Sequence, residues 1–266
     1  MKEFEVEREE KYVDPDEIKR PTSFLKWIEN FWYHYKWHTI IGLFFVILAI
    51  VLVVQLVQRE KYDIKIAYAG DFTVMGEDEN ATLLGDFPEA MEKISKAFES
   101  FISDDINNDK KKNAITHGEY LLSPEREAEL RKQAQDKSIE TNQQWAFNYS
   151  ANDRSTATEN VGVLLSTGEA IICLMDTYSY KTFGSDGAFA RLEDVLGYLP
   201  DSAIDECAVL LSNTAFGEYF KQSFEGLPED TVLCIRKKAT VGVGRDFDEI
   251  YAAHIDVFKK VIGFTY

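Results

Sequence analysis

Side chains that could bind or transform a ligand gather at the ends of three segments of this 266-residue chain. The clearest is Asp176, which closes the unbroken apolar run 171–175 and is followed by hydroxyl-bearing residues. A catalytic acid, a ligand-binding loop and a plain strand terminus would all give this pattern. Ligands of parallel α/β sheets bind beyond the carboxyl ends of strands. The candidate ligand-binding residues are therefore Asp71, Phe72, Asn152, Asp176, Thr177 and Tyr178.

Catalytic chemistry has little support in the sequence. Only His117 and His254 follow the long apolar segment near the N-terminus. His254 falls on the apolar face of a predicted C-terminal helix, where a core role is typical. The motifs of serine nucleophiles, zinc proteases, dinucleotide sites and P-loops are absent. We therefore expect neither an enzyme nor a cofactor, and an anchored hydrolase is the least favoured alternative.

A weak calcium-loop pattern occurs in the polar stretch after residue 103. Asp105, Asn107 and Asp109 have the spacing of positions 1, 3 and 5 of an EF-hand-like loop. Position 6 is Lys110 where the turn favours glycine, and position 12 is Thr116 where a bidentate acid should lie. We therefore expect a solvated polar loop and no metal site.

The three cysteines, Cys173, Cys207 and Cys234, are an odd number without a short spacing. They form neither a disulfide framework nor a zinc motif. Each lies in an apolar run, which is typical of a small buried hydrophobic residue. A Cys207–Cys234 bridge stays open at this stage.

A membrane anchor is the strongest signal in the chain. The segment from Thr39 to Val57 contains no charged side chain. A helix of this length spans roughly 28 Å, about the thickness of the hydrocarbon core of a bilayer. The segment starts far from the N-terminus and is not followed by a small-residue cleavage site. We therefore predict an uncleaved signal anchor in the lipid bilayer, rather than a cleaved signal peptide or a buried helix.

The residues around this segment define three parts of the chain. Residues 1–37 form a tail whose aromatic residues, among them Phe24, Phe31 and Tyr35, predict an interfacial helix. Residues 38–58 form the anchor, and residues 59–266 form an α/β domain. The basic residues on the two sides barely differ in number. A short tail before one span and a large domain after it favour a cytoplasmic N-terminus and an extracytoplasmic C-terminal domain in the cell membrane.

The net charge of −17 disfavours a nucleic-acid partner. From residue 62 onward, strand-like and helix-like patterns alternate, which predicts a single mostly parallel sheet with helices on both faces. Residues 103–144 are a polar excursion from this alternation. Strands are expected at 62–70, 144–150, 171–176, 206–212 and 231–237. Helices are expected at 88–102, 124–138, 156–167, 189–196, 214–224 and 245–262.

Three short patterns around the apolar run 171–175 carry a family resemblance. They are Gly168-Glu169-Ala170 before the run, then Gly187-Ala188-Phe189 and Leu192-Glu193-Asp194 after it. With the first strand and helix, they resemble the extracellular solute-binding proteins of the type 2 periplasmic-binding-protein fold. The resemblance implies one lobe of that fold. Fewer than about 80 residues follow for a second lobe, too few for a full domain, and two lobes are needed to close on a solute.

The function expected from these observations is that of a single-pass membrane protein with a solute-binding-protein-like extracytoplasmic domain. It would act as an accessory or interaction component of a membrane transport or envelope complex, with a multispanning transporter permease as the candidate partner. A membrane-anchored small-solute receptor of an ABC-type transporter is the alternative.

Overall fold

The computed structural model divides the chain between Glu60 and Lys61 into two compact units. It describes residues 24–58, 61–73, 83–135, 149–185, 187–238 and 247–265.

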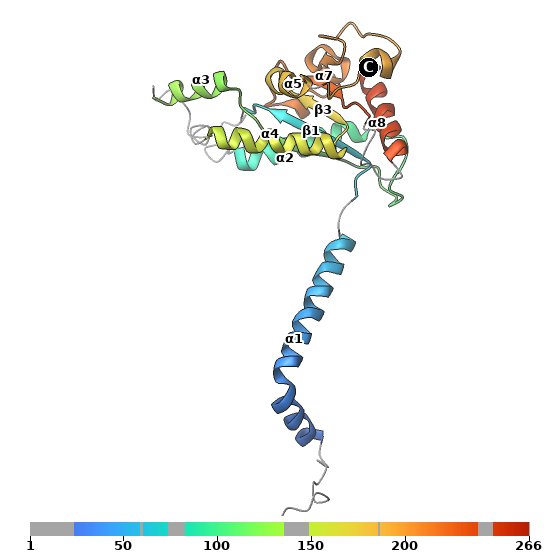
Figure 1. Cartoon of the computed structure of the whole chain (residues 1–266). Coiled ribbons are helices and arrows are strands. Elements are labelled where there is room, and N and C mark those ends of the chain that lie inside the picture. The colour runs from blue at the N-terminus through green and yellow to red at the C-terminus, as the bar shows by residue number, and fades with distance from the viewer. Residues whose placement is uncertain are drawn as a thin grey trace, which may run out of the picture. The chain divides into compact units, whose positions relative to one another are not determined.

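The first unit is described by one helix, α1 (Phe24–Gln58), drawn in blue in Figure 1. Its part Trp27–Val54 is long and apolar enough to cross a membrane, and its apolar side chains are exposed. These 28 residues span about 42 Å, close to a whole bilayer with its headgroup regions. The hydroxyl of Thr39 donates to the Tyr35 carbonyl at 3.0 Å, so this polar group is satisfied within the helix.

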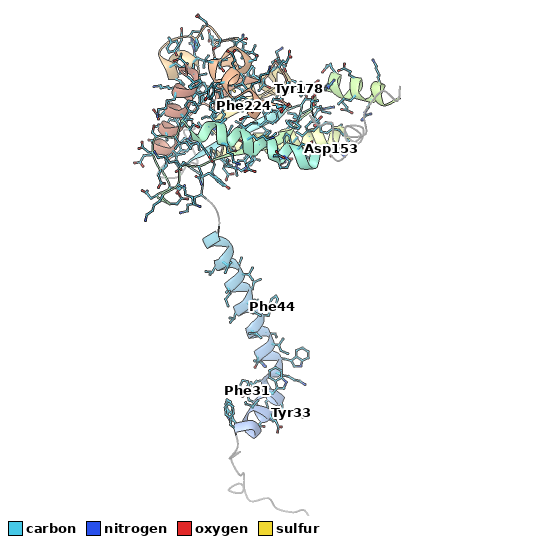
Figure 2. The ribbon with its side chains drawn as sticks, turned by 180° about the vertical axis from the view of Figure 1, so that it is seen from behind. Phe31, Tyr33, Phe44, Asp153, Tyr178 and Phe224 are labelled. Atoms are coloured by element: carbon cyan, nitrogen blue, oxygen red, sulfur yellow. The ribbon has the colours of Figure 1, made fainter. Side chains whose placement is uncertain are left out.

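The predicted aromatic face lies at the start of α1. Phe24, Trp27, Phe31 and Tyr35 stack in series, with successive ring centroids 6.3, 5.7 and 5.3 Å apart. Figure 2 shows Phe31 and Phe44 projecting outward from the helix. Aromatic rings near the end of an apolar helix are typical of the membrane–water interface.

The second unit is an α/β domain around one five-stranded sheet with the strand order β2-β1-β3-β5-β4. The strands are β1 (Ile64–Gly70), β2 (Ala114–Tyr120), β3 (Ile172–Met175), β4 (Ala208–Leu210) and β5 (Val232–Ile235). β1 pairs in parallel with β2 and β3, with Ile66 opposite both Thr116 and Ile172.

The prediction of a mostly parallel sheet is wrong, because β5 runs antiparallel to both of its neighbours, β3 and β4. The N–H of Leu211, just after β4, donates to the carbonyl of Thr231, just before β5, at 2.9 Å. The connection between the two strands therefore leaves and re-enters the sheet at the same end. A parallel pair needs a crossover to the opposite end, so the sheet is mixed.

Helices cover both faces of the sheet, as predicted. The apolar residues of α2, α6, α7 and α8 pack on one face, and those of α4 and α5 pack on the other. The bounds are α2 (Leu83–Glu99), α3 (Pro124–Gln135), α4 (Ala151–Thr167), α5 (Thr177–Gly184), α6 (Leu192–Leu196), α7 (Ala215–Tyr219) and α8 (Phe247–Ile262), with short 3-10 turns at Leu211–Asn213 and Lys221–Phe224.

The starts of two helices differ from the prediction. α2 begins at Leu83, so Pro88 lies inside the helix and does not open it. α4 begins after Ser150, whose side chain forms a capping box with Asp153, rather than at Thr156. The predicted stop of α4 at Gly168 is confirmed by a left-handed φ of 73°.

The polar excursion contains a strand that the sequence did not indicate. β2 occupies residues 114–120, where the sequence reads AITHGEY. It is the edge strand of the sheet, so one face and one edge stay accessible and its residues are mixed in polarity. Residues 144–148 of the predicted strand 144–150 lie outside the described residues. Tyr149 and Ser150 precede α4 and are not in a strand.

Candidate functional site

Five of the six predicted ligand-binding residues come together at the carboxyl ends of β1 and β3. Asp71 and Phe72 follow β1, and Asp176 separates β3 from α5, which begins with Thr177 and Tyr178. The sixth, Asn152, is exposed in the first turn of α4. The structure therefore places these five residues at one edge of the sheet, and their role in ligand binding stays a prediction.

Asp176 links two strand ends and begins a helix. Its Oδ2 accepts the N–H of Asp71 at 3.1 Å, and its Oδ1 accepts the N–H of Ser179 at 2.7 Å. The second bond makes Asp176 the N-cap of α5. Thr177 and Tyr178, which were expected in a loop at the strand end, therefore lie in the first turn of α5. Burial raises the pKa of the Asp176 carboxyl.

Asp71 is also occupied by neighbouring groups. Its Oδ1 accepts the Tyr120 hydroxyl at 3.0 Å and the N–H of Phe72 at 2.8 Å. Its Oδ2 accepts the guanidinium Nε of Arg126 on α3 at 2.8 Å. The Asp71 carboxylate, a candidate ligand-binding group, therefore links β1, β2 and α3 through hydrogen bonds.

The other three predicted residues at this edge also lie against neighbouring parts of the domain. The N–H of Thr177 donates to Asp230 at 3.2 Å. Phe72 is buried and packs edge-to-face on Phe87 of α2, with centroids 5.3 Å apart. Tyr178 lies on α5 (Figure 2), and its side chain is half-buried. These contacts fit a strand terminus that organises the fold, and ligand binding here stays a prediction.

The weak calcium-loop pattern folds on its own main chain. Asp105 accepts the N–H groups of Asp109 and Lys110, at 3.2 and 2.6 Å. Asn107 Oδ1 accepts the Asp109 N–H at 2.9 Å. The buried carboxylate of Asp63 accepts three further loop N–H groups, those of Ile106, Asn107 and Asn113. Across the described residues, no group of three or more His, Cys, Asp or Glu could hold a metal ion.

The three cysteines are unpaired thiols. Cys173 and Cys234 are fully buried and lie opposite each other on β3 and β5. Cys207 is half-buried, with its Sγ 4.0 Å from the Phe189 carbonyl. The Cys207–Cys234 bridge that the sequence left open is not formed.

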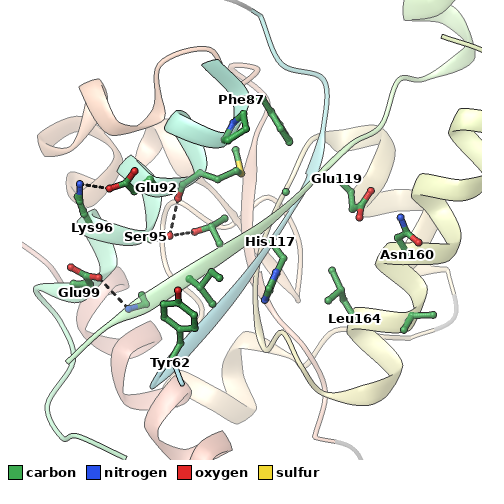
Figure 3. A pocket seen from close by; sticks show the side chains of 17 residues that line it. Tyr62, Phe87, Glu92, Ser95, Lys96, Glu99, His117, Glu119, Asn160 and Leu164 are labelled. Atoms are coloured by element: carbon green, nitrogen blue, oxygen red, sulfur yellow. Dashed lines mark hydrogen bonds and ion pairs between the residues drawn. The ribbon is translucent and has the colours of Figure 1, made fainter. Parts of the chain in front are cut away.

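A cavity of about 830 Å³ lies along the outer edge of β2, between α2 and α4. We call it the edge groove. In Figure 3, β2 crosses the view between the two helices, with His117 and Glu119 projecting from the strand. The walls include Phe87, Met91 and Ser95 of α2 and Asn160, Val163 and Leu164 of α4.

The two walls of the edge groove contact alternate residues of β2. On the α2 side, the Thr116 and Ser95 hydroxyls are hydrogen-bonded at 2.9 Å. A Cβ on Gly118 would lie 2.6 Å from Met91 Sδ, so glycine lets α2 approach the strand. On the α4 side, Val163 is 52% exposed. An exposed aliphatic side chain beside a strand edge is available for contact with a partner.

The charges of the edge groove are mainly acidic. Glu92 forms an ion pair with Lys96 at 2.6 Å, and the charge of Lys96 also acts on Glu99, so one lysine faces the three carboxylates of Glu92, Glu99 and Glu119. Glu99 accepts the Ala114 N–H at 3.3 Å. Burial raises the pKa of Glu119.

The two histidines of the domain do not form a catalytic pair. His254 is buried on α8, and its Nε2 accepts the Lys65 N–H at 2.9 Å. Its Nδ1 therefore carries the proton and donates to the Ile250 carbonyl at 2.7 Å. His117 lies in the edge groove, where burial and Lys65 lower its pKa.

Sequence reasoning missed the edge groove because it missed β2. The available signal was the alternation of small buried residues, Ala114 and Thr116, with Ile115 between them.

Comparisons with protein-family models, curated proteins and solved structures find no match to this chain.

Proposed function

We propose that this chain is a single-pass membrane protein whose α/β domain is an extracytoplasmic interaction module. It serves as an accessory component of a membrane transport or envelope complex. The observation that carries the interaction role is the edge groove, where the edge of the sheet lies between two helices and includes the exposed side chain of Val163. Concave sites with apolar walls and a few polar groups are the usual binding sites of proteins.

The residues at the carboxyl ends of β1 and β3 favour an interaction module over a protein that binds a ligand at these strand ends. Asp71 and Asp176 use their oxygens for hydrogen bonds within the domain. A ligand that competed for them would have to break the cap of α5 or the bonds that join β1 to α3. Such groups stabilise the fold, whereas a binding site needs donors and acceptors that face an opening.

Anchoring rests on α1. A helix with apolar side chains exposed along Trp27–Val54 is stable in lipid, where its main-chain groups are satisfied internally. An N-terminal signal sequence has the same composition. The proposal is that the helix is retained, with the N-terminus in the cytoplasm and the domain outside it.

A small-solute receptor is the second candidate. The volume of the edge groove, about 830 Å³, falls within the range of small-molecule sites. The resemblance to solute-binding proteins points the same way. A solute that binds the folded domain would raise its melting temperature by mass action.

Fractionation and co-purification of the full chain test the proposal. Intact mass should stay at 30.5 kDa in the membrane fraction, and a reporter fused after Tyr266 should be active outside the cytoplasm. A mild-detergent extract should retain a multispanning partner. The partner should be lost with Val163→Arg in the groove and kept with Thr156→Arg, an exposed position of α4 outside the groove. Loss of the N-terminal segment, a cytoplasmic reporter signal or equal retention by both variants would contradict it.

A further inference from the structure

We propose that the edge groove binds an extended, basic segment of a partner protein, which adds to β2 as a further strand of the sheet. This inference rests on the proposed interaction role and names the chemistry of the occupant. Three features carry it: the direction of the β2 main chain, the helical walls and the charge of the lining.

The main chain of β2 presents hydrogen-bonding groups to the groove. The Asn113 carbonyl accepts the Ile64 N–H at 3.2 Å, and the Leu121 N–H donates to the Gly70 carbonyl at 3.0 Å. Residues 113 and 121 therefore face β1. Because main-chain groups alternate in direction along a strand, the even-numbered residues between them face the groove.

Glu99 supports this assignment and limits the docking region. Its carboxylate accepts the N–H of Ala114 from the groove side, at 3.3 Å. The N–H groups of Thr116 and Gly118 point in the same direction further along the strand. Added strands lie about 4.8 Å from their neighbour. A peptide backbone can therefore pair at Thr116 and Gly118, with Glu99 marking one end.

The opposite edge of the sheet does not offer the same site. The Ile204 N–H donates to the Ala208 carbonyl, and the Leu210 N–H donates to the Ser202 carbonyl, both at 3.0 Å. Residues 202–204 thus pair with the outer edge of β4. In the part of the chain that the structure describes, no strand pairs with the outer edge of β2.

The lining specifies a basic occupant. Glu99 lies at the start of β2 on the α2 side, and Glu119 projects near its end toward Asn160 of α4. Side chains of an added strand alternate between these two sides. Two side chains of the added strand that are an odd number of positions apart therefore face opposite walls. The two carboxylates lie beside Ala114 and at Glu119, which are five residues apart along β2. Basic side chains five positions apart can meet both carboxylates.

The probe is a capped nine-residue peptide of alternating threonine and valine with lysine at its third and eighth positions. It is added to the full chain in nanodiscs, with binding measured by fluorescence anisotropy and amide exchange measured at Thr116 and Gly118. Two matched peptides serve as controls, one with glutamate for both lysines and one N-methylated at alternate residues.

Binding of the lysine peptide should slow exchange at Thr116 and Gly118. Each control peptide, and Val163→Arg in the protein, should weaken binding by about tenfold or more, whereas Thr156→Arg should leave it unchanged. Equal binding of the N-methylated peptide would overturn strand addition. So would full protection of both amides before peptide is added, because this chain or a second copy would then already occupy the edge.

The failure of this inference can be told apart from that of the proposed function. If Val163→Arg abolishes co-purification of a partner but no peptide slows exchange at Thr116 and Gly118, the interaction role stands and the strand-addition proposal is wrong. If neither result depends on Val163, both are wrong.

Discussion

Replacing His254 with glutamine tests whether the terminal helix is held by a neutral imidazole. The ring is buried, and both of its nitrogens bond main-chain groups, those of Lys65 in β1 and Ile250 in α8. Burial lowers its pKa from 6.5 to about 4. The folded state therefore binds this proton less readily than the unfolded state does.

The sign of the pH effect follows from this difference. The stability that the neutral ring supplies is complete above the unfolded pKa of about 6.5 and is lost as pH falls toward the folded value. The full loss is roughly 3 kcal/mol, of which roughly 1 kcal/mol falls between pH 7.0 and 5.5. This is a sizeable share of a typical unfolding free energy of about 5–15 kcal/mol.

The assay is urea unfolding of the full chain in detergent at pH 7.0 and 5.5, above its isoelectric point of 4.7. Cys173 and Cys234 are buried thiols. Their accessibility to a pulse of pyridyl disulfide, which reacts in acid, reports unfolding. Carboxyls with raised pKa values, such as Asp176, act in the opposite direction. The contributions of these carboxyls to the pH dependence cancel when the wild type is compared with His254→Gln.

Relative to the variant, the wild type should lose roughly 1 kcal/mol of unfolding free energy between the two pH values. An unchanged difference between the two proteins would show that the imidazole is not held neutral, and the account of α8 docking would be refuted.

Three further sets of substitutions probe two helical glycines, the cap of α5 and the membrane anchor. In Gly162→Ala the added Cβ meets open space beside α4, so the substitution should stabilise the domain by about 0.5–1 kcal/mol. In Gly217→Ala the added Cβ would lie 2.1 Å from the Leu211 carbonyl oxygen, so the substitution should destabilise the domain by about 1–3 kcal/mol. The same urea titration measures both effects. Asp176→Ala should cost about 1–2 kcal/mol through loss of the α5 cap, and Asp176→Asn should restore most of it, because asparagine also caps helices; equal losses would contradict the capping role. Phe44→Lys combined with Ile47→Lys should release the chain from membranes on alkaline extraction, since each lysine near the centre of a span costs roughly 2.5–3.5 kcal/mol, and full retention would argue against a transmembrane α1.

Segments with one dominant pattern were predictable from the sequence. The charge-free run within α1 and the continuous apolar run of β3 each admit few structures, and both elements form. The apolar face of α8 is likewise confirmed, including the buried position of His254. In these segments burial is set by residue type, so the local pattern and the fold agree.

Elements that depend on distant partners were not predictable. β2 is polar in part, because its stability comes from pairing with β1 over its full length and from Gly118, which lets α2 approach. The direction of β5 depends on where the chain re-enters the sheet, which residue patterns do not record.

The candidate site likewise has features that the sequence could predict and features that it could not. The sequence correctly brought the ends of β1 and β3 to one edge, because parallel strands share it. It could not show that Asp176 accepts the N–H of Asp71 or that the Asp71 carboxylate accepts Arg126, since these partners lie up to 105 positions apart. The groove beside β2 depends on three elements from separate parts of the chain, so no local motif marks it.

Site-specific photocrosslinking in intact membranes can identify which face of the domain contacts a partner. A benzophenone side chain is placed at Val163 in the edge groove or at Tyr178 near the carboxyl ends of the strands, in the full chain. If a partner binds in the edge groove, position 163 should give a discrete adduct of higher mass and position 178 should give none. An adduct from position 178 alone would contradict binding in the edge groove, because the partner would then bind at the strand ends and not at the edge of β2.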